Sequence, residues 1–147
     1  MPIAFARLEF VKRSSGKNAC GKAAYNSRSR IHAIGNEWQP ARTFDWSSRP
    51  PPVYHEVLLP EGVDPKFKSP EILWNAVEQK EVRRNSQTAF EMVLALPDDK
   101  VVSLEDKKHL ARTFVEAHFV KHRLAAQIDI HAPDIKHVSG EYEQADH

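Results

Sequence analysis

The sequence is poor in residues that mark several protein classes. Cys20 is its one cysteine, which excludes an internal disulfide and fits a reducing compartment. Glycine occurs five times and never forms a glycine-rich phosphate loop, which argues against a doubly wound nucleotide-binding fold. No apolar run approaches the roughly 18 residues of a membrane span, and the N-terminus lacks the pattern of a signal peptide. We therefore expect a cytoplasmic protein without membrane insertion.

Positive charge is concentrated in the N-terminal third, although the net charge of the 147-residue chain is only +1. Residues 1–49 contain nine Lys or Arg and three acidic residues, a balance of +6. The remaining residues contain 12 Lys or Arg and 17 acidic residues, a balance of −5. This asymmetry indicates a polyanionic partner for the N-terminal part, and the alternative is an ordinary solvated surface.

Hydrophobic periodicity predicts strands that alternate with helices. The predicted strands cover residues 2–11, 53–60, 88–97 and 125–131, and the predicted helices cover 16–31, 69–81 and 103–122. Ser69 and Ser103 are expected N-caps because serine accepts a hydrogen bond from the first helical turn. Residues 32–52 end in "SSRPPP" and are expected to form a loop.

The expected architecture is a single α+β domain over residues 1–147, in the order β-α-β-α-β-α-β. The first and last strands alternate apolar and polar residues, which is typical of a sheet with one buried face. Leu8 and Phe10 are expected on the buried face of the first strand. We therefore predict an antiparallel sheet with helices packed on one face and an open polar face.

Tyr25 is the first candidate for chemistry. It lies in "GKNACGKAAYNSRSRI", a predicted helix with small residues on one face, and it falls at the border of that face. A phenol has a pKa near about 10 and needs a base or a cation before it becomes a good nucleophile. From the residues alone, the favoured alternative is a tyrosine that closes the edge of the core. The basic residues around it, which would attract phosphate, are Lys17, Lys22, Arg28 and Arg30.

His131 is the second candidate, because it ends a strand two residues after Asp129. Imidazole is a common metal ligand, and a neighbouring carboxylate can hold its tautomer. Glu91 lies in an otherwise apolar strand and requires a partner, since burying a lone carboxylate is costly. No role is assigned to His55. Cys20 lies between two lysines and could be an activated thiolate, but its position on the small-residue face favours packing.

Several segments, taken in order, resemble the MobA/MobL (MobQ-class) relaxases of mobilisable and conjugative plasmids. The first, "VKRSSGKNACGKAAYNSRSRI", resembles the motif that carries the nucleophilic tyrosine. The block "LWNAVEQKEVRRNSQTAFEMVLALP" and the run "FVEAHFVKHRLAAQIDIHAP" resemble later parts of the family. Each motif is weak alone, but together they cover nearly the whole chain.

The resemblance implies a bacterial relaxase with an HUH-endonuclease-like fold, a five-stranded antiparallel sheet backed by helices. Tyr25 would attack a scissile phosphate in single-stranded DNA at an origin of transfer and remain joined to the 5′ end. His131 would help to bind a divalent cation, Mg²⁺ or Mn²⁺. Other relaxosome proteins are possible partners. DNA bases would stack on the open sheet face, with possible stacking partners at Phe5, Trp38, Phe44 and Trp46.

One expected element does not occur. The family carries a Pro-His-x-His-hydrophobic segment after the first histidine, and this sequence has none. The nickase domain is therefore expected to be truncated at its C-terminus, and this chain could be inactive. Two other classes stay open: a non-catalytic single-stranded nucleic-acid-binding domain, in which Tyr25 stacks or packs, and a protein-interaction domain.

Overall fold

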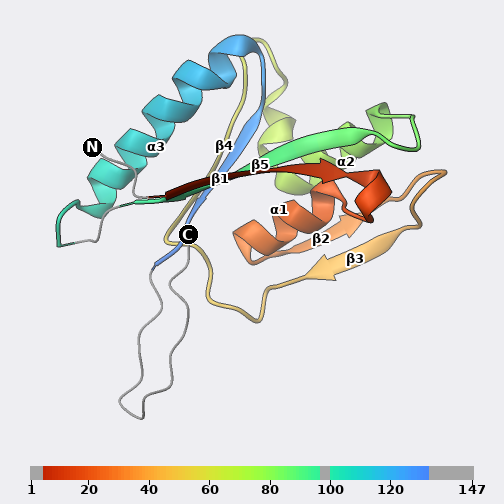
Figure 1. The fold of residues 1–147 in the computed structure, drawn as a ribbon, viewed down its shortest axis with the longest axis horizontal. Coiled ribbons are helices and arrows are strands. Elements are labelled where there is room, and N and C mark those ends of the chain that lie inside the picture. Colours follow the sequence, from red (N-terminus) through yellow and green to blue (C-terminus); the bar gives the residue numbers. More distant parts are fainter. Residues whose placement is uncertain (1–4, 97–99, 133–147) are drawn as a thin grey trace.

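The computed structural model describes residues 5–96 and 100–132 (Figure 1). The strands are β1 (Phe5–Lys12), β2 (Arg30–Ala33), β3 (Arg42–Asp45), β4 (Tyr54–Leu58), β5 (Gln87–Ala95) and β6 (Ala126–Ile130). The helices are α1 (Ala19–Ser27), α2 (Pro70–Lys80) and α3 (Leu104–His118), with short 3-10 turns η1 (Arg13–Ser15), η2 (Pro65–Lys68) and η3 (Val120–His122).

The described strands form three antiparallel pairs, β1 with β5, β2 with β3 and β4 with β6. In the first pair Glu9 lies opposite Glu91, and in the third pair His55 lies opposite Asp129. The α+β class and the antiparallel pairing agree with the expectation.

The three helices begin where short polar side chains cap them. Asn18 accepts a hydrogen bond from the Cys20 amide, Ser69 from the Ile72 amide and Ser103 from the Asp106 amide. Each bond satisfies an amide that has no partner within the helix, which fixes the helix start locally. The predicted caps at Ser69 and Ser103 are confirmed.

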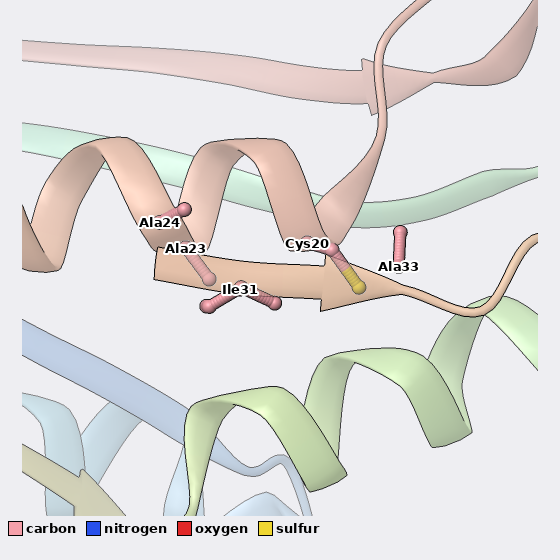
Figure 2. Packing of buried hydrophobic residues seen from close by; sticks show 5 residues of the cluster. All are labelled: Cys20, Ala23, Ala24, Ile31 and Ala33. Atoms are coloured by element: carbon pink, nitrogen blue, oxygen red, sulfur yellow. The ribbon is translucent and has the colours of Figure 1, made fainter. Parts of the chain in front are cut away.

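Small side chains let α1 lie close to its neighbours. The buried residues Cys20, Ala23 and Ala24 of α1 gather with Ile31 and Ala33 of β2, as Figure 2 shows. A wider side chain at these helix positions would push β2 away, since cores pack at nearly crystalline density. The small-residue face predicted from the sequence is therefore the face that anchors α1.

β2 and β3 form a hairpin where the sequence predicted the end of a helix and a loop, which corrects the predicted element order. Ile31 of β2 lies opposite Phe44 of β3, and Phe44 packs against α1 at Gly21. A Cβ atom on Gly21 would lie 2.9 Å from the Phe44 ring. The two strands are only four residues long, and they are stabilised by packing on α1 rather than by a strong strand pattern of their own. The observed order is β-α-β-β-β-α-β-α-β.

The apolar face of β1 is also less buried than expected. Leu8 is 51% exposed and Phe10 is 45% exposed. Phe10, its cross-strand partner Phe90, and Phe114 of α3 line a cavity of about 620 Å³. Residues along both β5 and β6 line this cavity, and Phe10 and Phe90 border it while they stay partly exposed.

The helices contact both faces of the β4–β6 ribbon. Ile128 and Val120 pack with Val115 of α3 on one face. On the other face, Gln127 accepts a hydrogen bond from Trp74 of α2 and donates one to the Ala23 carbonyl of α1. Because successive strand residues point to opposite faces, the polar face of this ribbon meets α1 and α2 at Gln127 instead of being open along its whole length.

Candidate functional site

Tyr25 lies near the C-terminal end of α1 in an aromatic and cationic setting. Its ring meets the edge of Trp46, with centroids 4.9 Å apart and planes at 87°. The Arg28 guanidinium lies over the same ring, 4.5 Å from the centroid. Edge-to-face aromatic pairs and cation–π contacts are both attractive. The half-buried phenol is therefore held from two sides, at the border of the packed face as the sequence predicted.

The backbone at the end of α1 places Arg28. This residue is the C-cap in the left-handed conformation, with φ 51° and ψ 46°. The left-handed residue turns the chain out of the helix and lets the side chain fold back, where it donates a hydrogen bond to the Tyr25 carbonyl. Arg28 is only 8% exposed. The sequence correctly named Arg28 as a neighbour of Tyr25, but its position over the ring depends on this backbone turn.

Lys17 and Lys22 are paired with acidic side chains. Lys17 forms an ion pair with Glu9, and Lys22 lies 3.6 Å from Glu9 and 3.4 Å from Glu91. Asn26 donates a second hydrogen bond to Glu91, at 2.8 Å. Glu91 therefore has the partners that its strand position required. The two lysines have less unbalanced charge to offer a polyanion than the sequence suggested.

Arg30 lies at the start of β2, opposite Asp45 on β3. Two hydrogen bonds from Ser47 lower the pKa of the exposed Asp45, and the positive charge of Arg30 adds to this effect. The exposed Arg30 thus faces an ionised carboxylate. The position remains compatible with a phosphate contact, although part of its charge is balanced.

Sequence reasoning missed a buried ion pair at the opposite end of α1. The Arg13 and Glu78 side chains are 1% and 4% exposed, and their charged atoms lie 3.0 Å apart. The second Glu78 oxygen accepts the Ala19 amide at 2.7 Å. A carboxylate at a helix N-terminus also interacts favourably with the helix dipole. The sequence carried one signal for this pair: Glu78 follows Val77 on the inward side of α2, where a carboxylate requires a partner.

His131 follows β6 and lines the same cavity as Lys22, Asn26, Glu91 and Asp129. Tyr25 is not among the residues that line it. The structure therefore places His131 and Glu91 on the lining of one cavity, whereas Tyr25 contacts Trp46 and Arg28.

Asp129 is already engaged by two side chains. Its oxygens accept from His55 at 2.6 Å and from Gln127 at 2.7 Å. The hydrogen bond to Asp129 raises the pKa of His55, and the negative charge of Asp129 adds to the shift. Asp129 thus orients His55, the histidine without an assigned role, across the strand pair.

The described residues do not form a metal site by themselves. Within 5–96 and 100–132, no group of three or more His, Cys, Asp or Glu side chains could hold an ion together. His131 is one candidate ligand, and a single histidine does not provide the converging donors that a divalent cation requires.

Cys20 is fully buried, and burial raises the pKa of its thiol to about 12, with the charge of Glu78 adding to the shift. It is a packing residue, as its helix face indicated.

Among the described helices, none has the length and apolar composition to cross a bilayer.

A family model described as the MobA/MobL family matches residues 17–139, which include α1, all later elements and both candidate residues, Tyr25 and His131. The chain belongs to the MobA/MobL family. The resemblance seen in the sequence is therefore confirmed.

Curated relatives carry names from mobilisation and conjugal transfer. The probable mobilization protein MobA of Bifidobacterium longum (strain NCC 2705) is 32% identical over 97 residues, which cover 66% of this chain and 16% of the relative. The conjugal transfer protein TraA of Rhizobium radiobacter is 30% identical over 137 residues, covering 86% of this chain and 12% of the relative. This MobA/MobL chain thus spans less than a fifth of the length of either relative.

A solved structure described as "Molecular Basis of Vancomycin Resistance Transfer in Staphylococcus aureus" matches with a TM-score of 0.68 and 28% identity. The match covers 97% of this chain and 76% of that chain. Nearly the full length of this MobA/MobL chain thus shares the expected α+β fold with a solved protein.

Proposed function

We propose that this chain is the strand-cleaving part of a DNA relaxase and that Tyr25 is its nucleophile. The observation that carries the proposal is the setting of Tyr25, a phenol held between Trp46 and Arg28 on the helix that bears the family's tyrosine motif. Membership of the MobA/MobL family and relatives named for mobilisation and conjugal transfer support it.

The reaction is a transesterification. The Tyr25 oxygen attacks the scissile phosphorus, and the bond from phosphorus to the 3′ oxygen of the preceding nucleotide breaks. The phenol loses its proton, and the departing 3′ oxygen gains one. One phosphodiester bond is exchanged for another, so a later attack by a 3′ hydroxyl can rejoin the strand.

Arg28 would act as a fixed positive charge beside the reacting atoms. Its guanidinium lies 4.5 Å from the centre of the phenol ring and is nearly buried, where charge interactions are screened less than in bulk water. A cation in this position offsets the negative charge that develops on the phosphate in the transition state.

We also propose that His131 supplies one ligand to a divalent cation, Mg²⁺ or Mn²⁺. When bound, such an ion would polarise the oxygens of the scissile phosphate. The described residues supply too few ligands for this site, so the proposal needs donors beyond them. The roles of Tyr25 and Arg28 do not depend on it.

The proposed substrate is single-stranded DNA at an origin of transfer, with other relaxosome proteins as possible partners. The test is a denaturing gel on which a labelled strand that carries such an origin forms a covalent adduct with the protein. Tyr25→Phe should abolish the adduct, because it removes the attacking oxygen, while strand affinity stays within about twofold since the ring remains.

Tyr54→Phe is the matched control, because Tyr54 is a second half-buried tyrosine, which bonds Glu56 on β4. This variant should form the adduct as the unaltered chain does. An adduct formed by Tyr25→Phe would contradict the assignment of the nucleophile.

A second candidate is a non-catalytic single-strand-binding domain. The contact of Tyr25 with Trp46 favours it, because clustered rings also serve as stacking platforms for bases. Strand binding by the unaltered chain without any denaturant-stable adduct would support this candidate over the relaxase.

A further inference from the structure

Arg28 after α1, Arg42 on β3 and Arg49 after β3 each lie over an aromatic ring. Besides Arg28 over Tyr25, the Arg42 guanidinium lies 4.7 Å from the centre of the Phe44 ring, and that of Arg49 lies 5.1 Å from the centre of the Trp46 ring. Arg42 and Arg49 are exposed, and Phe44 and Trp46 are half-buried. The rings of Phe44 and Trp46 therefore support the exposed guanidinium groups of Arg42 and Arg49.

The rings themselves are fixed by α1. Phe44 packs on the helix where Gly21 leaves room, and Trp46 meets Tyr25 edge to face. The Trp46 amide also donates to the Ser29 carbonyl at 3.0 Å, which ties β3 to the end of α1. A guanidinium that rests on a fixed ring loses less conformational freedom when it binds a ligand. The exposed arginines are thus partly preorganised.

A ring contact leaves the charge of an arginine unneutralised, whereas an ion pair does not. Among the described residues neither Arg42 nor Arg49 has a carboxylate partner. Asp45 lies between them in the sequence, but it points to the other face of β3 and bonds Ser47. Within the described part of this hairpin and its following turn, Arg42 and Arg49 therefore supply positive charge that no carboxylate balances.

We propose that Arg42 and Arg49 bind successive backbone phosphates of single-stranded DNA and guide the strand along β3 to Tyr25, with Phe44 and Trp46 as stacking surfaces for its bases. This inference rests on the proposed function and specifies the path of its substrate. Guanidinium groups bind phosphate through paired N–H donors, and bases stack on aromatic rings and on guanidinium planes. Lys17 and Lys22 are paired with Glu9 and Glu91 and therefore contribute little charge to strand binding.

The experiment compares two variants that remove the same charge. The affinity of a fluorescein-labelled oligo(dT) single strand is measured against salt for the unaltered chain, for R42A/R49A and for K17A/K22A. Losing two phosphate contacts should lower the slope of log affinity against log salt by about 1.4 in R42A/R49A, at about 0.7 for each contact. Affinity at about 0.1 M salt should fall roughly ten- to thirtyfold on the same basis. The slope of K17A/K22A should stay unchanged.

A third variant, R42K/R49K, separates the effect of the positive charge from that of the planar contact with the rings. It keeps two positive charges but loses the planar contact with the rings, so the slope should return while affinity stays below that of the unaltered chain. Thermal melting of all variants checks that the hairpin remains folded.

Three results would overturn the inference. An unchanged slope in R42A/R49A, or a loss confined to K17A/K22A, would place the strand elsewhere while leaving the relaxase proposal intact. A complete lack of oligo(dT) binding by the unaltered chain would overturn both.

Discussion

The two ends of α1 carry similar positive charge in the sequence and very different surfaces in the structure. At the N-terminal end and along the side that faces β1 and β5, Lys17 and Lys22 pair with Glu9 and Glu91. At the C-terminal end, Arg28 rests on the ring of Tyr25. Positive residues close in sequence thus pair with carboxylates at one end and contact an aromatic ring at the other. The identity of the neighbours differs because β1 and β5 supply glutamates to one end, whereas Tyr25 supplies a ring to the other.

The buried contact that fixes the N-terminal end should show the largest effect on stability. Glu78→Ala removes the partner of Arg13 and of the Ala19 amide, leaving a buried guanidinium without its carboxylate. Breaking a buried pair in this way costs about 3–5 kcal/mol of unfolding free energy. Urea denaturation followed by circular dichroism measures the loss.

Glu105→Ala is the control for this prediction. Glu105 is 81% exposed and pairs with Lys108 on α3, so its removal should cost less than about 1 kcal/mol. Equal losses for the two variants would show that the Glu78 contact does not hold α1 in place.

A second change should leave the charge of Lys22 on α1 less balanced by acidic neighbours. Glu91→Gln keeps a side-chain oxygen for Asn26 and removes the negative charge beside Lys22. Lys22 then keeps only Glu9, 3.6 Å away, as an acidic partner, so its charge is less balanced and the salt slope of single-strand binding should steepen by up to about 0.7.

Glu56→Gln is the matched control, because it removes a carboxylate that pairs with Arg112 on the distant β4 and α3 elements. Its slope should equal that of the unaltered chain. A slope that stays constant in Glu91→Gln would mean that the path of the strand does not approach Lys22 at all.

The smallest effect concerns the β4–β6 ribbon, which contacts the middle of α1 through Gln127. The pKa of His55 is raised above its ordinary 6.5 by Asp129, so the protonated form is favoured in the folded state. The stabilisation is fully present below the ordinary pKa and is lost as pH rises through the raised one. His55→Gln should therefore lower stability at about pH 5 by no more than about 1 kcal/mol, and by less at about pH 8.

Urea midpoints at the two pH values test this, with His109→Gln, an exposed histidine on α3, as the control. The control should change stability equally at both pH values. A His55→Gln effect that grows with pH would contradict the assigned sign.

Local sequence determined the parts of this protein that depend on neighbouring residues. Ser69 and Ser103 cap helices because their partners are amides three residues ahead. The face with Cys20, Ala23 and Ala24 follows from helical spacing, and so does the position of Tyr25 at its border. The family motifs are also local, which is why the resemblance could be recognised before the fold was known.

Tertiary structure alone decided which charges cancel and which stay available. Arg13 and Glu78 are 65 residues apart in the sequence, and Lys22 and Glu91 are 69 apart. The contact of Trp46 with Tyr25 needs a hairpin whose short strands carry only a weak pattern, so the sequence predicted a loop there. Such pairs form because packing of whole elements places them together. Periodicity and spacing describe one element at a time, and they do not encode which side chains of distant elements meet.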